Sequence, residues 1–167
     1  MAVELKPINL AVGRAIWNRF GDIRTFAVNI HLKFPFAVVG GVLVIPTYED
    51  TGTKAAIEAE EKEIAETEDT DHSDSETSKS GTPEIVSTPV SRKSTIHLIE
   101  RAIERLIRAG GRKSEAEAAH LLEGIAVLVY DPDTATILSD LPKAGSGLRW
   151  KEFTHDLMTT YRARFED

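Results

Sequence analysis

The chain has 167 residues, of which 27 are acidic, 20 are lysine or arginine and none is cysteine. This length suffices for one domain with a hydrophobic core, and a chain without cysteine has no disulfides, thiolate zinc sites or cysteine nucleophile. The N-terminal sequence MAVELKPINL lacks the apolar segment of a signal peptide. The longest apolar run, Phe36 to Pro46, is too short to span a membrane. We therefore expect a cytoplasmic protein without a membrane segment.

The net charge of −7 is concentrated in one segment. From Glu49 to Glu84 there are 13 acidic residues and 3 lysines, whereas the rest of the chain carries 14 acidic and 17 basic residues. A mildly basic remainder is compatible with a polyanionic ligand, but its charge is well below that of a dedicated nucleic-acid-binding domain.

The first elements predicted are a strand and a helix. Ala2 to Leu5 is expected to form a short strand that Pro7 ends, because proline cannot donate a hydrogen bond to a neighbouring strand. Asn9 is the expected N-cap of a helix. The apolar residues of this helix recur at intervals of four, four and three, at Val12, Ile16, Phe20 and Ile23.

The sequence leaves the end of this helix open. Gly21 and Asp22 either end the helix or only distort it locally. Arg24 to Lys33 is compatible with a second helix or with an extended segment. Pro35 stops either structure.

A buried strand is predicted next. Phe36 to Ile45 is short, apolar on both faces and rich in β-branched residues, as expected of a strand covered on both sides. Gly40 and Gly41 within it indicate either a bulge or the close approach of other atoms to the backbone.

A long insert is predicted from Thr47 to Arg92. This stretch is rich in Glu, Asp, Ser and Thr and has no aromatic residue after Tyr48. Such a segment buries too little apolar surface to offset the entropy lost on ordering. We therefore expect a disordered acidic insert, which divides the chain into residues 1–46, 47–92 and 93–167.

Two helices are predicted after the insert. The first begins at a Ser94 or Thr95 N-cap and runs to Gly110-Gly111. Its apolar stripe is Ile96, Ile99, Ile103, Leu106 and Ile107. A capping box of Ser114 and Glu117 predicts a second, short helix that Gly124 closes.

The remaining elements are a strand, a turn, an edge strand and a final helix. Ile125 to Tyr130 has the apolar composition of a buried strand. Asp131 to Thr134 reads as a turn, and Ala135 to Leu138 as an edge strand. The final helix ends at Phe165 and has one apolar face, formed by Phe153, Leu157, Tyr161 and Phe165. The fold class predicted is α/β, with a small central mixed sheet flanked by helices.

One cluster suggests chemistry, the sequence Glu4-Leu5-Lys6 on the first strand. Side chains alternate along a strand, so Glu4 and Lys6 are expected on one face and Leu5 in the core. A carboxylate beside an ammonium group could hold a divalent metal and orient a water for attack on phosphate. The same pattern also occurs as a simple surface ion pair.

A strand with Glu-x-Lys, then a long helix, then an apolar strand resembles the central part of the PD-(D/E)XK nuclease superfamily, which includes many type II restriction endonucleases. The resemblance is clearest from Val3 to Ile45. It implies a restriction-endonuclease-like fold, hydrolysis of DNA with Mg²⁺, a metal-ligating role for Glu4 and a water-orienting role for Lys6.

The chain departs from this family in one respect. The family also has a metal-binding Asp on an earlier strand, whereas only three residues precede Glu4 and the first Asp is Asp22, on the predicted helix. Either the missing half lies on another chain or was lost, or the Glu-x-Lys match is accidental. We expect the chain alone to be inactive, since one carboxylate holds a divalent metal weakly.

Four arginines after the insert are candidates for DNA binding. Arg101, Arg105, Arg108 and Arg112 are spaced four, three and four, which predicts one helical face that would contact phosphates. Glu100 and Glu104 lie beside them and favour a solvated surface instead. The competing function is therefore a non-catalytic module that presents its acidic insert to a basic partner.

Overall fold

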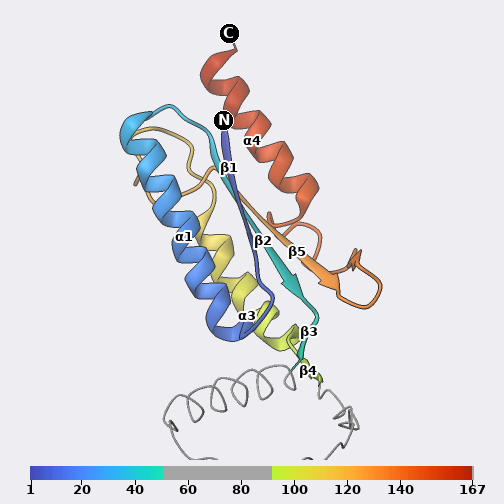
Figure 1. The fold of residues 1–167 in the computed structure, drawn as a ribbon. Coiled ribbons are helices and arrows are strands. Elements are labelled where there is room, and N and C mark those ends of the chain that lie inside the picture. Colours follow the sequence, from blue (N-terminus) through green and yellow to red (C-terminus); the bar gives the residue numbers. More distant parts are fainter. Residues whose placement is uncertain (51–91, 167) are drawn as a thin grey trace, which may run out of the picture. The chain divides into compact units, whose positions relative to one another are not determined.

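The computed structural model describes residues 1–50 and 92–166 (Figure 1). Most of the segment predicted to be a disordered insert therefore lies outside the described residues. The chain divides into two compact units, Met1–Glu49 with Ser94–Asp167, and Asp50–Lys93. The fold and candidate site described below belong to the first unit.

A four-stranded mixed sheet forms the centre of this unit, as predicted. Its strands are β1 (Ala2–Pro7), β2 (Val39–Pro46), β5 (Gly124–Asp131) and β6 (Thr136–Ile137), in the order β1-β2-β5-β6. The first three are parallel and β6 is antiparallel to β5. Strand β1 is thus an edge of the sheet among the residues that the structure describes.

Helices cover both faces of the sheet (Figure 1). Helices α1 (Val12–Lys33) and α3 (Ile96–Leu106) lie on one face, where the larger apolar cluster is buried. Helix α4 (Trp150–Phe165) covers the other face, where Phe153 and Leu157 complete a smaller cluster. No helix of the described part of the chain is long and apolar enough to cross a membrane.

Strand β1 continues through Pro7 instead of ending before it. The backbone N–H groups of Ala2 and Ile8 donate to the carbonyls of Val38 and Val44 at 2.9 Å. In a parallel pair, alternate residues bond the same neighbour, so the even-numbered residues of β1 face β2. The nitrogen of Pro7 faces away from β2, and its missing N–H costs this pairing nothing.

Helix α1 is continuous, which resolves both open questions of the sequence. Gly21 lies in its interior, where a Cβ atom would meet nothing within 4 Å. The N-cap predicted at Asn9 is wrong, because the cap residue is Ala11, with φ 50°. Glu49 supplies the missing acceptor from a distance, since its Oε2 accepts the Val12 N–H at 2.9 Å.

The two glycines of β2 permit close packing on both faces of the sheet. A Cβ atom at Gly40 would lie 2.7 Å from Phe153 Cε2 on α4, and one at Gly41 would lie 2.5 Å from Ile23 Cγ2 on α1. The register of β2 with both neighbouring strands is unbroken. Of the two alternatives, close approach is therefore correct.

The boundaries of the predicted insert and of the helix after it differ from the structure. Strands β3 (Tyr48–Asp50) and β4 (Arg92–Ser94) pair as a two-stranded sheet, so both ends of the predicted insert have regular structure. Thr95 is the N-cap of α3, as predicted. The α-helix ends at Leu106, and a 3₁₀ turn (Ile107–Ala109) follows it.

The short helix predicted from Ser114 to Gly124 is wrong. Residues 110–123 form turns and irregular structure, and Gly124 begins β5. The carboxylate of Glu117 accepts the Lys113 N–H at 3.0 Å, which is a local turn contact. Residues 115–118 are exposed and polar or small, so no apolar face is available to hold a helix against the sheet.

The turn and the final elements agree with the sequence. Asp133 N–H donates to the Asp131 carboxylate at 2.9 Å, and β6 follows at the edge of the sheet. On α4, Phe153 and Leu157 are buried, whereas Phe165 at the end of the predicted apolar face is 53 % exposed.

Candidate functional site

Glu4 and Lys6 lie side by side on β1. Glu4 Oε1 and Lys6 Nζ are 2.7 Å apart, and each side chain is 27 % exposed. Glu4 is in register with Gly41, whose missing Cβ would point at α1. Both charged side chains therefore lie on the α1 face of the sheet, since residues in register share a face.

The prediction that Leu5 enters the core is wrong. Its side chain is 56 % exposed, and that of Val3 is 44 % exposed. Both residues lie on the α4 face, because Val3 is in register with Gly40, which contacts Phe153. Helix α4 packs mainly on β5 and β2, so it leaves this face of the edge strand uncovered.

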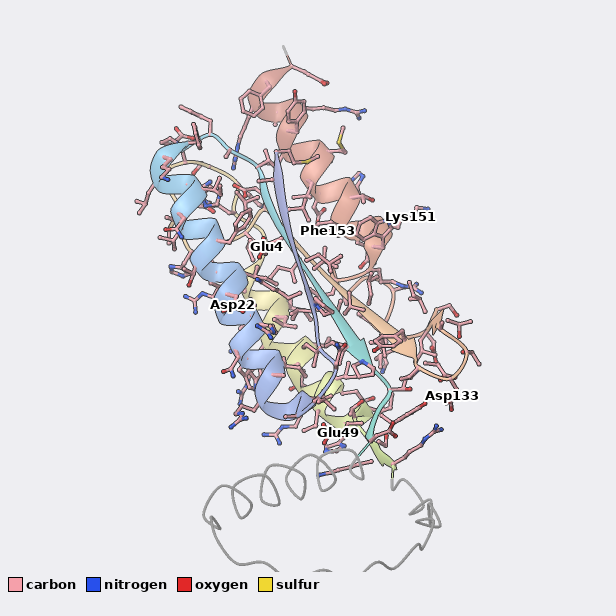
Figure 2. All side chains as sticks on the ribbon, viewed as in Figure 1. Glu4, Asp22, Glu49, Asp133, Lys151 and Phe153 are labelled. Carbon is pink, nitrogen blue, oxygen red and sulfur yellow. The ribbon has the colours of Figure 1, made fainter. Side chains whose placement is uncertain are left out.

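The described residues do not form a complete metal site. No group of three or more His, Asp or Glu side chains is close enough to hold an ion in the part of the chain that the structure describes. Asp22 lies on α1 (Figure 2), but it is exposed and pairs with Arg19 at 3.2 Å. Glu4 is thus a single acid neutralised by Lys6, and these residues alone do not fit a Mg²⁺ ion.

Three of the four predicted arginines are exposed on the α3 side of the unit. Arg101 and Arg105 lie on α3, and Arg108 lies in the 3₁₀ turn that follows. Arg101 and Arg105 line a shallow groove of about 140 Å³ together with Trp17. The guanidinium carbon of Arg105 lies 5.1 Å from the centre of the Trp17 ring, which is within cation–π range.

A second groove continues this surface toward the C-terminal end of α3. Arg105 and Arg108 line it together with Phe20, Arg24 and His120. The Arg24 guanidinium lies 5.9 Å from the centre of the Phe20 ring. Helices α1 and α3 thus form one surface on which arginines alternate with aromatic rings. The sequence indicated only the α3 half of it.

Arg112 does not belong to this surface. The helix ends before it, and its side chain is buried with its Nη1 2.8 Å from Glu123 Oε1. The predicted helical face that included Arg112 is therefore wrong for this residue. Its guanidinium has no free face for a phosphate.

The sequence gave no indication of the buried charged cluster around Glu123, at the start of β5. One carboxylate oxygen of Glu123 accepts from Arg112 and from Arg164, both at 2.8 Å. The other accepts the Val39 N–H at 2.8 Å and lies 3.2 Å from His31 Nε2. These residues come from α1, β2, α4 and the irregular segment of residues 110–123, so the cluster joins most of the unit.

Electrostatics keep this carboxylate ionised. Burial by itself raises the pKa of Glu123, but the hydrogen bonds from Val39, Arg112 and Arg164, with the charge of His31, together lower it below its usual value of 4.5. One glutamate before a buried strand has no distinctive spacing, and its partners are 11 to 92 residues away in sequence. Only the fold brings them together.

Comparison of the chain with protein-family models, with curated proteins and with solved structures gives no match. The site is therefore interpreted from its own residues.

Proposed function

We propose that the chain is part of a metal-dependent DNA endonuclease of the restriction type, in which Glu4 and Lys6 belong to the hydrolytic site. The observation that carries the proposal is the placement of these two side chains 2.7 Å apart on one face of an edge strand. The resemblance to the PD-(D/E)XK nucleases assigns Glu4 the role of metal ligand and Lys6 that of orienting the attacking water, and their adjacency is compatible with both roles.

The edge position of β1 supports the same proposal. A metal held against phosphate needs a further acid, and such an acid must come from outside the described residues. The side of β1 that has no neighbouring strand within the described residues offers backbone groups to which a strand carrying that acid can add. The isolated chain is then a partial enzyme without activity of its own.

The surface formed by α1 and α3 supports DNA as the ligand. Three exposed guanidinium groups lie on this surface, those of Arg101, Arg105 and Arg108. A guanidinium group can bind two oxygens of one phosphate at the same time. Trp17 is 37 % exposed and lies within cation–π range of Arg105, so an aromatic ring adjoins this guanidinium on the surface. Glu100 and Glu104 on the same helix reduce the local positive potential, so the expected binding is weak and sensitive to salt.

DNA binding is tested on the chain itself. Titration of a short fluorescent duplex, followed by anisotropy, should give weak binding whose salt dependence falls by about one charge for each arginine removed by Arg101→Ala or Arg105→Ala. Arg162→Ala is the matched control, because Arg162 is an exposed arginine on α4 whose partner, Glu166, lies 3.6 Å away. Equal losses in all three variants would refute a specific surface on α1 and α3.

Hydrolysis is tested by complementation. With Mg²⁺, the chain alone should leave DNA intact, and cleavage should appear when a segment carrying the further acid is joined or added. That cleavage should be lost in Glu4→Ala and in Lys6→Ala but retained in Glu104→Ala. Cleavage by the chain alone that persists in Glu4→Ala would place the chemistry in another part of the protein.

A further inference from the structure

We propose that the isolated chain self-associates, with the edge strand β1 of one copy pairing antiparallel with β1 of a second copy about Leu5. The two four-stranded sheets would then form one continuous sheet across a two-fold axis. This inference goes beyond the proposed nuclease function and does not depend on it. A second copy and an acid-bearing strand would occupy the same edge of β1, and self-association is the outcome for the chain alone.

The backbone groups of β1 that have no partner in residues 1–50 and 92–166 define what the strand can bind. Because the even-numbered residues bond β2, the N–H and C=O groups of Val3 and Leu5 point away from the sheet. In the proposed pair, Leu5 donates to the carbonyl of Leu5 in the second copy, and Val3 donates to that of Pro7. Pro7 enters only as an acceptor, so its missing N–H is tolerated at this edge.

The charges of β1 select one register for this pairing. Odd-numbered residues must face odd-numbered residues, which leaves a few antiparallel registers centred near Leu5. A register centred on Glu4 sets Glu4 opposite itself, and one centred on Lys6 sets Lys6 opposite itself. Centring on Leu5 places Glu4 of each copy directly opposite Lys6 of the other, at a cross-strand Cβ separation of about 5 Å.

The apolar residues of β1 favour the same pair. Val3 and Leu5 are 44 % and 56 % exposed on the α4 face, next to Val42 of the smaller apolar cluster. In the Leu5-centred register, Leu5 packs against Leu5 of the second copy and Val3 against Pro7. An exposed strand edge with apolar side chains on one face is prone to pair with another strand. Here the charges of β1 match a second copy of the same strand, because Glu4 of each copy faces Lys6 of the other.

The pairing is tested by charge exchange. Sedimentation or light scattering should give the wild-type chain a mass twice its 18.4 kDa at concentrations of about 100 μM, where even a moderate dimer is populated. Glu4→Lys and Lys6→Glu should each raise the dissociation constant about tenfold or more, because each sets like charges opposite one another. An equimolar mixture of the two variants should restore the dimer, and so should the double variant E4K/K6E.

A backbone variant tests the hydrogen bonds separately. Leu5→Pro removes an N–H that the fold of one copy does not use, so it should give a monomer with an unchanged circular dichroism spectrum. A wild-type monomer, or a dimer insensitive to both single charge variants, would overturn the proposal. The double variant separates the two proposals, since it restores self-association while leaving both nuclease positions substituted.

Discussion

Replacing Glu123 by alanine should be among the most destabilising single changes in this protein. The residue is 2 % exposed, and its carboxylate accepts from Arg112, Arg164 and Val39, each at 2.8 Å. The substitution leaves both guanidinium groups inside the protein without their counter-ion. Their Nε atoms already lack a hydrogen-bond partner within the described structure, so the loss of Glu123 adds to the donors that are unsatisfied.

The magnitude follows from the desolvation of the two arginines. Removing one member of a buried ion pair typically costs about 3–5 kcal/mol, because the remaining charge is uncompensated. Arg112 retains only long contacts of 3.3–3.5 Å with backbone carbonyls, whereas Arg164 keeps the Ala37 carbonyl at 2.8 Å. We therefore expect Glu123→Ala to lower the free energy of unfolding by about 3–5 kcal/mol, with most of the penalty at Arg112.

Urea unfolding followed by circular dichroism measures this loss. The double variant Glu123→Ala/Arg112→Met should be more stable than Glu123→Ala, since it removes the stranded charge. Arg162→Ala, which breaks an exposed pair, should change stability by less than about 0.5 kcal/mol. A loss below about 1 kcal/mol in Glu123→Ala would show that the cluster is hydrated and that burial does not set its energy.

Three further changes test the same fold. Because the pKa of Glu123 is lower in the folded protein than its usual 4.5, its contribution to stability is complete above that pH and is lost as the pH falls through the lower, folded value. The urea midpoint should therefore fall more steeply below about pH 4.5 in the wild type than in Glu123→Gln. Gly40→Ala should cost about 1–3 kcal/mol, because the added Cβ would lie 2.7 Å from Phe153. Gly21→Ala, in open space on α1, should instead stabilise the helix by up to about 1 kcal/mol, and thermal unfolding distinguishes the two.

The sequence predicted the buried strands from their continuous apolar runs, and it predicted α3, α4 and the first half of α1 from the helical spacing of their apolar residues. The stretch that became β2 is apolar on both faces and is buried on both. The segment from Arg24 to Lys33 was undecided between a helix and an extended structure, and packing resolved it, since Ala27 and His31 are buried. Local preference alone did not determine that segment.

The errors arose where distant residues replaced local signals. Asn9 was a reasonable N-cap by residue type, but Glu49, far away in sequence, supplies the acceptor at the start of α1. The capping box at Ser114 was a correct local pattern without an apolar face to hold it. In both places the local residues fit the start of a helix, but contacts with distant residues determined whether and where a helix begins.

The candidate site likewise depends on contacts that the local sequence does not contain, because β1 lies at the edge of the sheet. Alternation along β1 correctly predicted that Glu4 and Lys6 share a face, because that periodicity is a property of the strand itself. Whether Leu5 faces a core depends on what covers the opposite face, and no pattern within six residues contains that information. The same exposure that made the prediction for Leu5 wrong leaves backbone groups and an apolar side chain free at the edge, directly beside the charged pair. Any account of Glu4 and Lys6, whether as catalytic residues or as one half of a self-pairing surface, must therefore specify which strand lies next to β1.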